Sequence, residues 1–568
     1  MNKEEVLAIP STGRAATATW TAHLAMLTAI ALLACLVARL DRGLELSDEA
    51  YYLLYAIHAR SISVFFSPFH WVTGPLWELT GSLVAFRGAG MLLSIGAALV
   101  LAEGVLHAAK QTGLPVPDSA AGRNAVRATA ASGALLYGSM FSLTPSYNLM
   151  AAIGTNLATG LCLLAIGADR RRAVLLAVAA GACLALCFLS KVSSGPCVAA
   201  VLALLWLLVA EGRLRWYILW AAAAAVATVV AVAEMWGGIA QAINQVRTGV
   251  ELWGTATGNR SLPDQLLRSA ADLGRLLTGG VLAFWGPVAC FALALKWFST
   301  QLRWLGLAWF AVLLLTGRHL GGGYERFMLQ GQPLFAALLL ALLAWAPQWW
   351  RDVRRLALVA ALIVLPAAVA MGTSNPLEMQ VLMALAPWGA LVGLAGFAQA
   401  QRAAAAVSVL FGLVILAQLI GSGAEPYRTP PLSQQTEPIT VPRLGQVRVD
   451  PATAALARGF QQGAKACGIS AGQPFVDIYN APGVALLLDL VPVVGPWLND
   501  PEPASLLLAR ADPAELRRAV VVTTRRSPPG QLPVPPRQLA TFPEGYRLCA
   551  TAASPYDGAR MELWAPPS

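Results

Sequence analysis

Long apolar runs separated by short polar loops make up the first three quarters of the chain. Runs of this kind are long enough to cross roughly 30 Å of hydrocarbon as helices. The pattern predicts about thirteen spans, over 20–40, 83–107, 128–144, 149–168, 173–189, 196–210, 217–233, 278–295, 304–316, 333–347, 354–371, 382–398 and 404–420. We therefore expect a polytopic helical membrane domain over 1–421.

After residue 421 the apolar runs shorten to strand length. A Pro-rich polar stretch over 422–442 predicts a linker, and 443–568 predicts a domain with its own core. Helical patterns at 451–466 and 482–490 alternate with strand patterns at 474–480, 518–525 and 546–553. The tail therefore predicts a small α/β domain with a mixed sheet. It shows no catalytic constellation, and Asp477 is typical of a turn at a strand end.

Composition supports the membrane assignment. Hydrophobic residues are 57% and charged residues 12% of the chain, against roughly 25% charged in soluble domains. The net charge of +10 is spread over short loops rather than gathered in one patch, so it indicates topology and not nucleic-acid binding.

The loop charges predict the orientation, because Lys and Arg favour cytoplasmic loops. With a cytoplasmic N-terminus, the inner loops carry a large group of basic residues, among them Lys110, Arg170–Arg172, Arg213, Lys296, Arg351 and Arg402. We expect a bacterial inner (plasma) membrane protein whose C-terminal domain lies outside the cytoplasm. The long outer loops are then 41–82, 234–277 and 317–332.

The eight cysteines have no metal-ligand spacing. Six fall in or beside apolar spans and are typical of small packing residues. The other two, Cys467 and Cys549, lie in the tail, where an oxidising compartment would favour a disulfide between them.

Two adjacent carboxylates, Asp48 and Glu49, stand in the first outer loop, within the stretch LSDEAYYLLY (46–55). One interpretation is structural, since Ser47 can cap a helix whose first turn carries both acids. In that interpretation the tyrosines of the stretch form an interfacial belt. The other interpretation is a functional site, and further motifs on the same face favour it.

Those motifs are FHWVTGPLWEL (69–79), AFRGAG (85–90), TPSYNLMAA (144–152), FLSKVSSGP (188–196) and GRHLGGGYERFMLQGQPLFAALL (317–339). Their order resembles the GT-C class of membrane glycosyltransferases, including protein O-mannosyltransferases and aminoarabinose-transferase-like enzymes. The resemblance implies a polyprenyl-phosphate-linked sugar donor, about thirteen spans and an outer tail. Two positions depart from the aminoarabinose pattern: Val72–Pro75 replaces Glu-Lys-Pro-Pro, and Asn148 stands where an acid is common.

The resemblance implies that Asp48 is the general base, with Glu49 orienting the acceptor or holding a cation. Cations must meet the charge that grows on the leaving phosphate. The candidates are Lys191, at the outer end of a span, and Arg318, Tyr324 and Arg326 in the 317–332 loop. Tyr52, His70 and Asn148 are weaker substrate-binding candidates.

Several alternatives stay open at this level. No metal or cofactor is named by the sequence, although a divalent cation between the two carboxylates would relieve their repulsion. His70 and His319 are isolated and typical of ordinary hydrogen-bonding histidines. Glu78 and Arg87 could form an ion pair with each other. The glycines 321–323 would let their loop close over a lipid.

The function best supported is transfer of a hexosyl or pentosyl group to a cell-envelope glycan, lipid or protein. The alternative is a transporter or flippase of a lipid-linked sugar, but the sequence shows no internal repeat of the kind many transporters have. A non-catalytic scaffold would not need the clustered acids and bases. The tail would cover the outer cavity and help to select the acceptor.

Overall fold

The computed structural model describes residues 11–62, 64–65, 67–140, 144–210, 212–256, 264, 267–272, 274–275, 331–372, 375, 377–398, 402–496, 498, 501–525 and 533–567. The predicted spans 278–295 and 304–316 lie outside these residues. The loop residues 317–330, with Arg318, His319, Tyr324 and Arg326, lie outside them as well.

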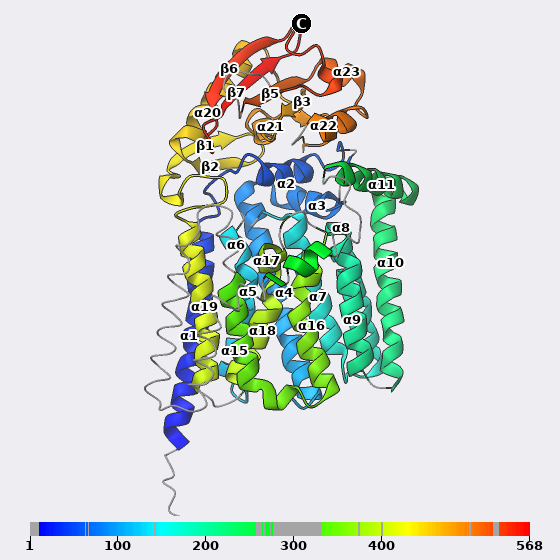
Figure 1. Cartoon of the computed structure of the whole chain (residues 1–568), viewed down its shortest axis with the longest axis vertical. Coiled ribbons are helices and arrows are strands. Elements are labelled where there is room, and N and C mark those ends of the chain that lie inside the picture. The colour runs from blue at the N-terminus through cyan, green and yellow to red at the C-terminus, as the bar shows by residue number, and fades with distance from the viewer. Residues whose placement is uncertain are drawn as a thin grey trace, which may run out of the picture.

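Helices stand side by side beneath a smaller α/β domain (Figure 1). The first half contains α1 (Ser11–Val37), α4 (Leu83–Gln111), α5 (Ala120–Leu135), α6 (Tyr137–Met140), α7 (Tyr147–Ala165), α8 (Arg170–Ser190), α9 (Ser194–Val209), η1 (Gly212–Trp216) and α10 (Tyr217–Met235). The second half contains α15 (Gly331–Trp349), α16 (Val353–Ala370), α17 (Leu377–Gln380), η3 (Val381–Ala384), α18 (Ala386–Phe397) and α19 (Arg402–Ser422).

Six helices of the described residues are long and apolar enough to cross a membrane, namely α1, α4, α7, α8, α10 and α16. Shorter apolar helices at Ser194–Val209, Ala386–Phe397 and Val407–Ser422 follow the predicted pattern. A helical membrane protein is therefore confirmed, and the count of thirteen spans stays a prediction. The predicted span 128–144 differs, since α5 begins at Ala120, where the Ser119 hydroxyl accepts a bond from the Gly122 N–H.

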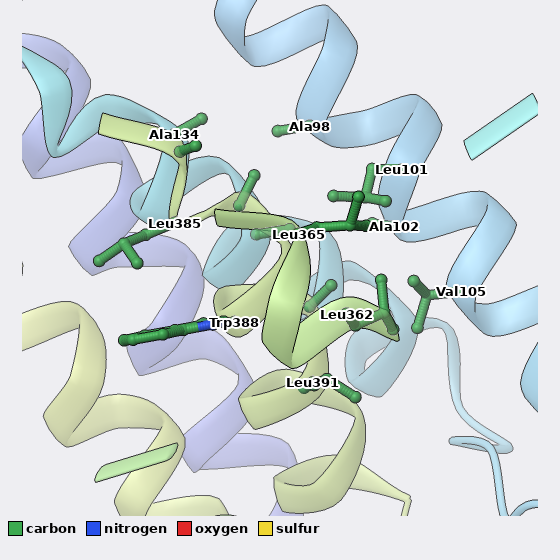
Figure 2. Packing of buried hydrophobic residues seen from close by; sticks show 14 of the residues in the cluster. Ala98, Leu101, Ala102, Val105, Ala134, Leu362, Leu365, Leu385, Trp388 and Leu391 are labelled. Atoms are coloured by element: carbon green, nitrogen blue, oxygen red, sulfur yellow. The ribbon is translucent and has the colours of Figure 1, made fainter. Parts of the chain in front are cut away.

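Small residues let the helices approach closely. A Cβ built on Gly104 of α4 would stand 2.4 Å from the carbonyl oxygen of Gly160 in α7. Such a contact excludes any larger residue there. Figure 2 shows apolar side chains of α4, α16 and α18 gathered in one cluster, and the Trp388 indole N–H donates to the Ile363 carbonyl at 2.9 Å. The result is a dry, closely packed base for the loops above.

Three helices lie across the top of this bundle (Figure 1). They are α2 (Asp48–Ile57), α3 (His70–Thr80) and α11 (Ile239–Ala256). The sequence predicts 41–82 and 234–277 as outer loops, with a helix suggested only at Asp48 and Glu49, because hydropathy detects spanning helices and overlooks short ones that lie flat.

The C-terminal domain begins with a hairpin of β1 (Glu437–Val441) and β2 (Gly445–Val449), followed by α20 (Pro451–Ala466). A five-stranded sheet has the order β4-β3-β5-β7-β6. Its elements are β3 (Pro474–Ile478), α21 (Gly483–Leu488), β4 (Val491–Pro492), α22 (Pro501–Leu508), α23 (Pro513–Arg517), β5 (Val520–Arg525), β6 (Arg547–Ala553) and β7 (Arg560–Ala565), with short η4 (Leu432–Gln434) and η5 (Arg537–Leu539). The sheet is mixed, since β3, β4 and β5 are parallel and β7 is antiparallel to its neighbours. The mixed α/β tail predicted from the sequence is thus confirmed.

The domain is joined tightly to the first loop. Buried side chains of α2, such as Leu53 and Leu54, share one apolar cluster with Phe460 of α20 and Val522 of β5. Backbone bonds add to this contact, for example from the Gly43 N–H to the Arg448 carbonyl at 2.8 Å. The fold therefore fixes the N-terminal end of α2 against both the bundle and the domain.

Cys467 and Cys549 form the predicted disulfide. It ties the end of α20 to β6 across 82 residues of sequence, with the two Cα atoms 5.9 Å apart. Of the other cysteines that the structure describes, all five are free thiols in the helical part.

Candidate functional site

The N-terminus of α2 carries the two carboxylates, and Glu45 rather than Ser47 caps it. The Glu45 carboxylate accepts bonds from the N–H groups of Ser47 and Glu49, both at 2.8 Å. The Ser47 hydroxyl makes no cap bond and donates to Glu45 instead. The interpretation of Ser47 as the cap is therefore wrong. Burial, with the nearby charge of Asp48, raises the pKa of Glu45 to about 7.

Asp48 keeps access to solvent, with 32% of its side chain exposed. The Tyr427 hydroxyl donates to Asp48 Oδ2 at 2.6 Å. Arg428 Nη1 lies 3.7 Å from the same oxygen and donates to Ser47 Oγ at 2.7 Å. Both partners come from the connector after α19, a stretch that the sequence suggested to be only a linker. Asp48 thus already accepts a hydroxyl donor, as it would accept one from an alcohol substrate.

Glu49 is buried in an ion pair. Arg87 donates to Glu49 Oε1 from Nε at 2.9 Å and from Nη2 at 2.6 Å, and the Thr144 hydroxyl donates to the same oxygen at 2.5 Å. The remaining donors of Arg87 bind the carbonyls of Leu40, Arg42 and Gly43. Arg87 therefore pairs with Glu49, and the suggested pair with Glu78 is wrong. This pair fixes α2 to α4 and to the start of α7.

Asp48 and Glu49 line a cleft with about 770 Å³ of empty space, part of it open to solvent. We call it the Asp48 cleft. Its polar walls are Arg39, Arg42, Glu45, Asp48, Glu49, Tyr52, Arg87, Ser139, Ser422, Tyr427, Thr429 and Gln435. Apolar side chains complete the wall, among them Leu36 in the last turn of α1 and Leu40 just after this helix. The cleft therefore joins an apolar helix end to a polar, charged floor.

Two arginines in the cleft have no carboxylate partner. Arg39 donates to the Ser422 hydroxyl at 3.1 Å and to the Leu419 carbonyl at 2.6 Å. Arg42 donates to the Leu432 carbonyl at 3.2 Å, and its buried Nε has no partner in the part of the chain that the structure describes. No carboxylate of these residues lies within 4.0 Å of either guanidinium. Their positive charge is available to an anion.

Lys191 lies at the end of α8 and does not line the Asp48 cleft. Its side chain is buried, and Nζ donates to the carbonyls of Val369 at 3.0 Å and Ala370 at 3.3 Å, at the end of α16. An ammonium has three donors, so one remains for a ligand. Its prediction as a phosphate-binding residue stays open, as do those of Arg318, Tyr324 and Arg326.

The three weaker substrate-binding candidates lie in different places, and only one of them lines the cleft. Tyr52 lines the cleft and packs edge-on against Tyr147, with the ring centroids 5.6 Å apart. Asn148 is buried at the start of α7 and does not line the cleft. His70 is 1% exposed and lies 4.5 Å from Phe65 between ring centroids, with no partner for Nδ1. Burial lowers the pKa of His70 to about 3, so the ring is neutral. The structure thus brings only Tyr52 to Asp48.

No group of three or more His, Cys, Asp or Glu side chains that could hold a metal ion occurs among the described residues. Within the cleft, the cation beside Glu49 is the guanidinium of Arg87. From the sequence alone, a divalent metal ion between the two carboxylates was an open alternative.

Sequence reasoning missed four charged or polar groups at the cleft: Arg39, Arg42, Glu45 and Tyr427. The first two carried a usable signal. Arg39 lies at the predicted outer end of the first span, 20–40, and Arg42 lies just after it, where arginine runs against the positive-inside bias. Tyr427 carried none, because nothing in a Pro-rich connector predicts a contact with a residue 379 positions away.

Comparisons with known proteins add two solved structures. No family model matches the chain, and no curated protein does. The crystal structure of ArnT from Cupriavidus metallidurans bound to undecaprenyl phosphate is similar at a TM-score of 0.47 and 16% identity, covering 95% of this chain and 99% of that one. Its apo form is similar at 0.40 and 15%, covering 95% and 98%. Both are structures of a transferase of the GT-C class that the motif order resembles.

Proposed function

We propose that the chain transfers a hexosyl or pentosyl group from a polyprenyl-phosphate donor to an acceptor hydroxyl, with Asp48 as the general base. The observation that carries the proposal is the Asp48 cleft. It combines a partly exposed carboxylate that already accepts a hydroxyl donor with two arginines that have no carboxylate partner among the described residues. Leu36 and Leu40 beside them suit an isoprenoid tail. The ArnT structure with undecaprenyl phosphate is consistent with a lipid phosphate of this kind.

The reaction needs one proton transfer and one bond exchange. The acceptor hydroxyl takes the place of the Tyr427 hydroxyl on Asp48. Its oxygen attacks the anomeric carbon while Asp48 accepts its proton. The bond from the anomeric carbon to the phosphate oxygen breaks, and the electron pair leaves with the polyprenyl phosphate. Arg39 and Arg42 would meet the negative charge that grows there, which is the differential stabilisation that lowers a barrier.

Glu49 has a different role in this proposal. Its charge is already balanced by Arg87, so we do not assign to it the part of the base or of a metal ligand. We assign to it the positioning of α2, and through α2 of Asp48. The earlier prediction, in which Glu49 orients the acceptor or holds a cation, would instead require the Arg87 pair to open.

The proposal places the C-terminal domain outside the cytoplasm. The disulfide between Cys467 and Cys549 supports this sidedness, because such bonds persist in oxidising compartments. A periplasm-active reporter fused after Ser568 should be active, and a cytoplasm-active reporter at the same place should be silent. The reverse pattern would put Asp48 on the wrong face for an outer acceptor.

Donor binding tests the arginines. Arg42→Gln should weaken binding of undecaprenyl phosphate about tenfold to a hundredfold, since a hydrogen bond to a charged group contributes about 1.5–3 kcal/mol. The purified protein in nanodiscs would be titrated with the lipid. The control is Arg458→Gln, an exposed residue that is paired with Glu437 and does not line the cleft, and this variant should bind normally.

Lys191→Gln separates the two candidate phosphate positions in the same titration. Loss of binding in Lys191→Gln with normal binding in Arg42→Gln would move the phosphate from the Asp48 cleft to the end of α8. Loss in both variants would show that the lipid phosphate contacts both groups.

A further inference from the structure

A second cavity lies where the C-terminal domain meets the segment before α2. It contains about 890 Å³ of empty space, part of it open to solvent. We call it the interdomain cavity. Its walls include Glu45, Ser47, Thr429, Asn480, Thr524 and Tyr556.

The cavity lies at the carboxyl ends of parallel strands. β3 and β5 run parallel, with Ile478 opposite Thr523, and Asn480 and Thr524 come at or just after these ends. From β3 the chain continues to β4, which lies on one side of β3 in the sheet. From β4 it continues to β5, which lies on the other side of β3. Open α/β sheets bind ligands in the crevice at such a switch of direction.

Thr524 has an unpartnered hydroxyl here. On β5 the side chains of Val520 and Val522 belong to the apolar cluster shared with α2 and α20. Thr524 follows at the same spacing of two residues, so its side chain is on the same face of the strand. It is 8% exposed. Its Oγ1 is shielded from solvent and has no hydrogen-bond partner among the described residues. A buried hydroxyl without a partner costs stability unless a ligand or water satisfies it.

The interdomain cavity is next to the Asp48 cleft. Glu45 and Thr429 line both spaces. Arg428 also lines the cavity, and its guanidinium reaches Ser47 at 2.7 Å and Asp48 at 3.7 Å. A molecule bound in the cavity could therefore present a hydroxyl to Asp48.

We propose that the interdomain cavity binds an uncharged sugar residue of the acceptor. Hydroxyl and amide groups on its walls can exchange hydrogen bonds with a polyol, and the exposed Tyr556 ring offers an apolar face. Arg428 is the one basic residue among the described residues of the wall, and it lies beside Asp48, so the wall offers no concentrated positive charge to an anion. This inference rests on the proposed function, since it gives the acceptor of that reaction a place and a chemical class.

The test uses the full-length protein in a detergent without a sugar headgroup, lauryldimethylamine oxide. Methyl glycosides of glucose, galactose, mannose and N-acetylglucosamine are titrated one at a time by saturation-transfer NMR. At least one glycoside should bind the unmodified protein. Binding of none of them would overturn the proposal.

Thr524→Val is the first variant. It should weaken glycoside binding about twofold to tenfold, the effect of one lost hydrogen bond. It should not lower the unfolding temperature, because the hydroxyl has no hydrogen-bond partner to lose in the part of the chain that the structure describes. Unchanged glycoside binding would show that this hydroxyl does not contact the sugar, which contradicts the proposal.

Ser554→Trp is the second variant and places a large ring at the wall of the cavity. It should reduce binding more than tenfold, whereas Ala553→Trp, at the exposed neighbouring residue outside the wall, should bind normally. Equal binding by both variants would place the sugar elsewhere. Binding of undecaprenyl phosphate is measured on the same samples: its absence in the unmodified protein would contradict the proposed function, whatever the glycosides do.

Discussion

Asp48→Asn should lower turnover by roughly two to four powers of ten, the usual contribution of a positioned general base. Asparagine keeps the size of the side chain and can still accept the bond from Tyr427. It cannot take a proton from an acceptor hydroxyl, so the attacking oxygen would have to lose its proton to water. The effect should appear in the chemical step, because no partner of the donor phosphate is removed.

Two measurements distinguish a slower chemical step from a loss of donor binding or of folding. Undecaprenyl phosphate should bind Asp48→Asn within about threefold of the unmodified protein. The unfolding temperature should be similar, since the asparagine keeps the bond from Tyr427 and loses only the partly exposed ion pair with Arg428. Glu78→Gln is the matched control, as an exposed carboxylate in the same outer loop, and should keep full turnover. Near-normal turnover by folded Asp48→Asn would contradict the role of Asp48 as the general base. The Asp48 carboxylate would then only interact favourably with the dipole at the N-terminus of α2.

Arg87→Ala should give the largest loss of stability. It removes both bonds to Glu49 and the three bonds to carbonyls of the segment before α2. Glu49 would remain buried with an uncompensated charge, and breaking a buried pair in this way typically costs about 3–5 kcal/mol. We expect a large fall in the unfolding temperature of the purified protein, and a smaller loss when Glu49→Gln is added, because the double variant leaves no unpaired charge.

The control for this prediction is an exposed pair. Arg247 and Glu251 lie at 3.1 Å on α11 with exposed side-chain fractions of 78% and 56%. Arg247→Ala should therefore change stability by no more than about 1 kcal/mol. Equal unfolding temperatures for Arg87→Ala and Arg247→Ala would contradict the role of the buried pair in holding α2.

The sequence predicted those parts of the molecule that follow from local pattern. Apolar runs marked the helices of the bundle, and the helix at Pro451–Ala466 matches its prediction residue for residue because Asp450 caps it and Pro451 begins it. Asp48 and Glu49 marked 41–82 as the predicted place of the site, and the structure puts both at the cleft on which the proposed function rests.

What the sequence did not predict depends on contacts between distant segments. Asp48 and Glu49 look equivalent in the printed sequence, yet one is partly exposed beside Tyr427 and the other is buried against Arg87. Hydropathy could not show that Glu45 turns back to cap α2, since capping by a residue three positions before the helix depends on loop geometry. The connector after α19 gave no sign that its side chains reach the cleft.

Release of free undecaprenyl phosphate tests the central claim most directly. The purified protein in nanodiscs would be given undecaprenyl-phosphate-linked hexoses and pentoses, with cell-envelope glycolipid as the acceptor. Our account predicts acceptor-dependent release of undecaprenyl phosphate with at least one donor, together with a labelled acceptor, and loss of both products in Asp48→Asn. Movement of an intact lipid-linked sugar across the bilayer, with no cleavage in the presence of acceptor, would contradict it.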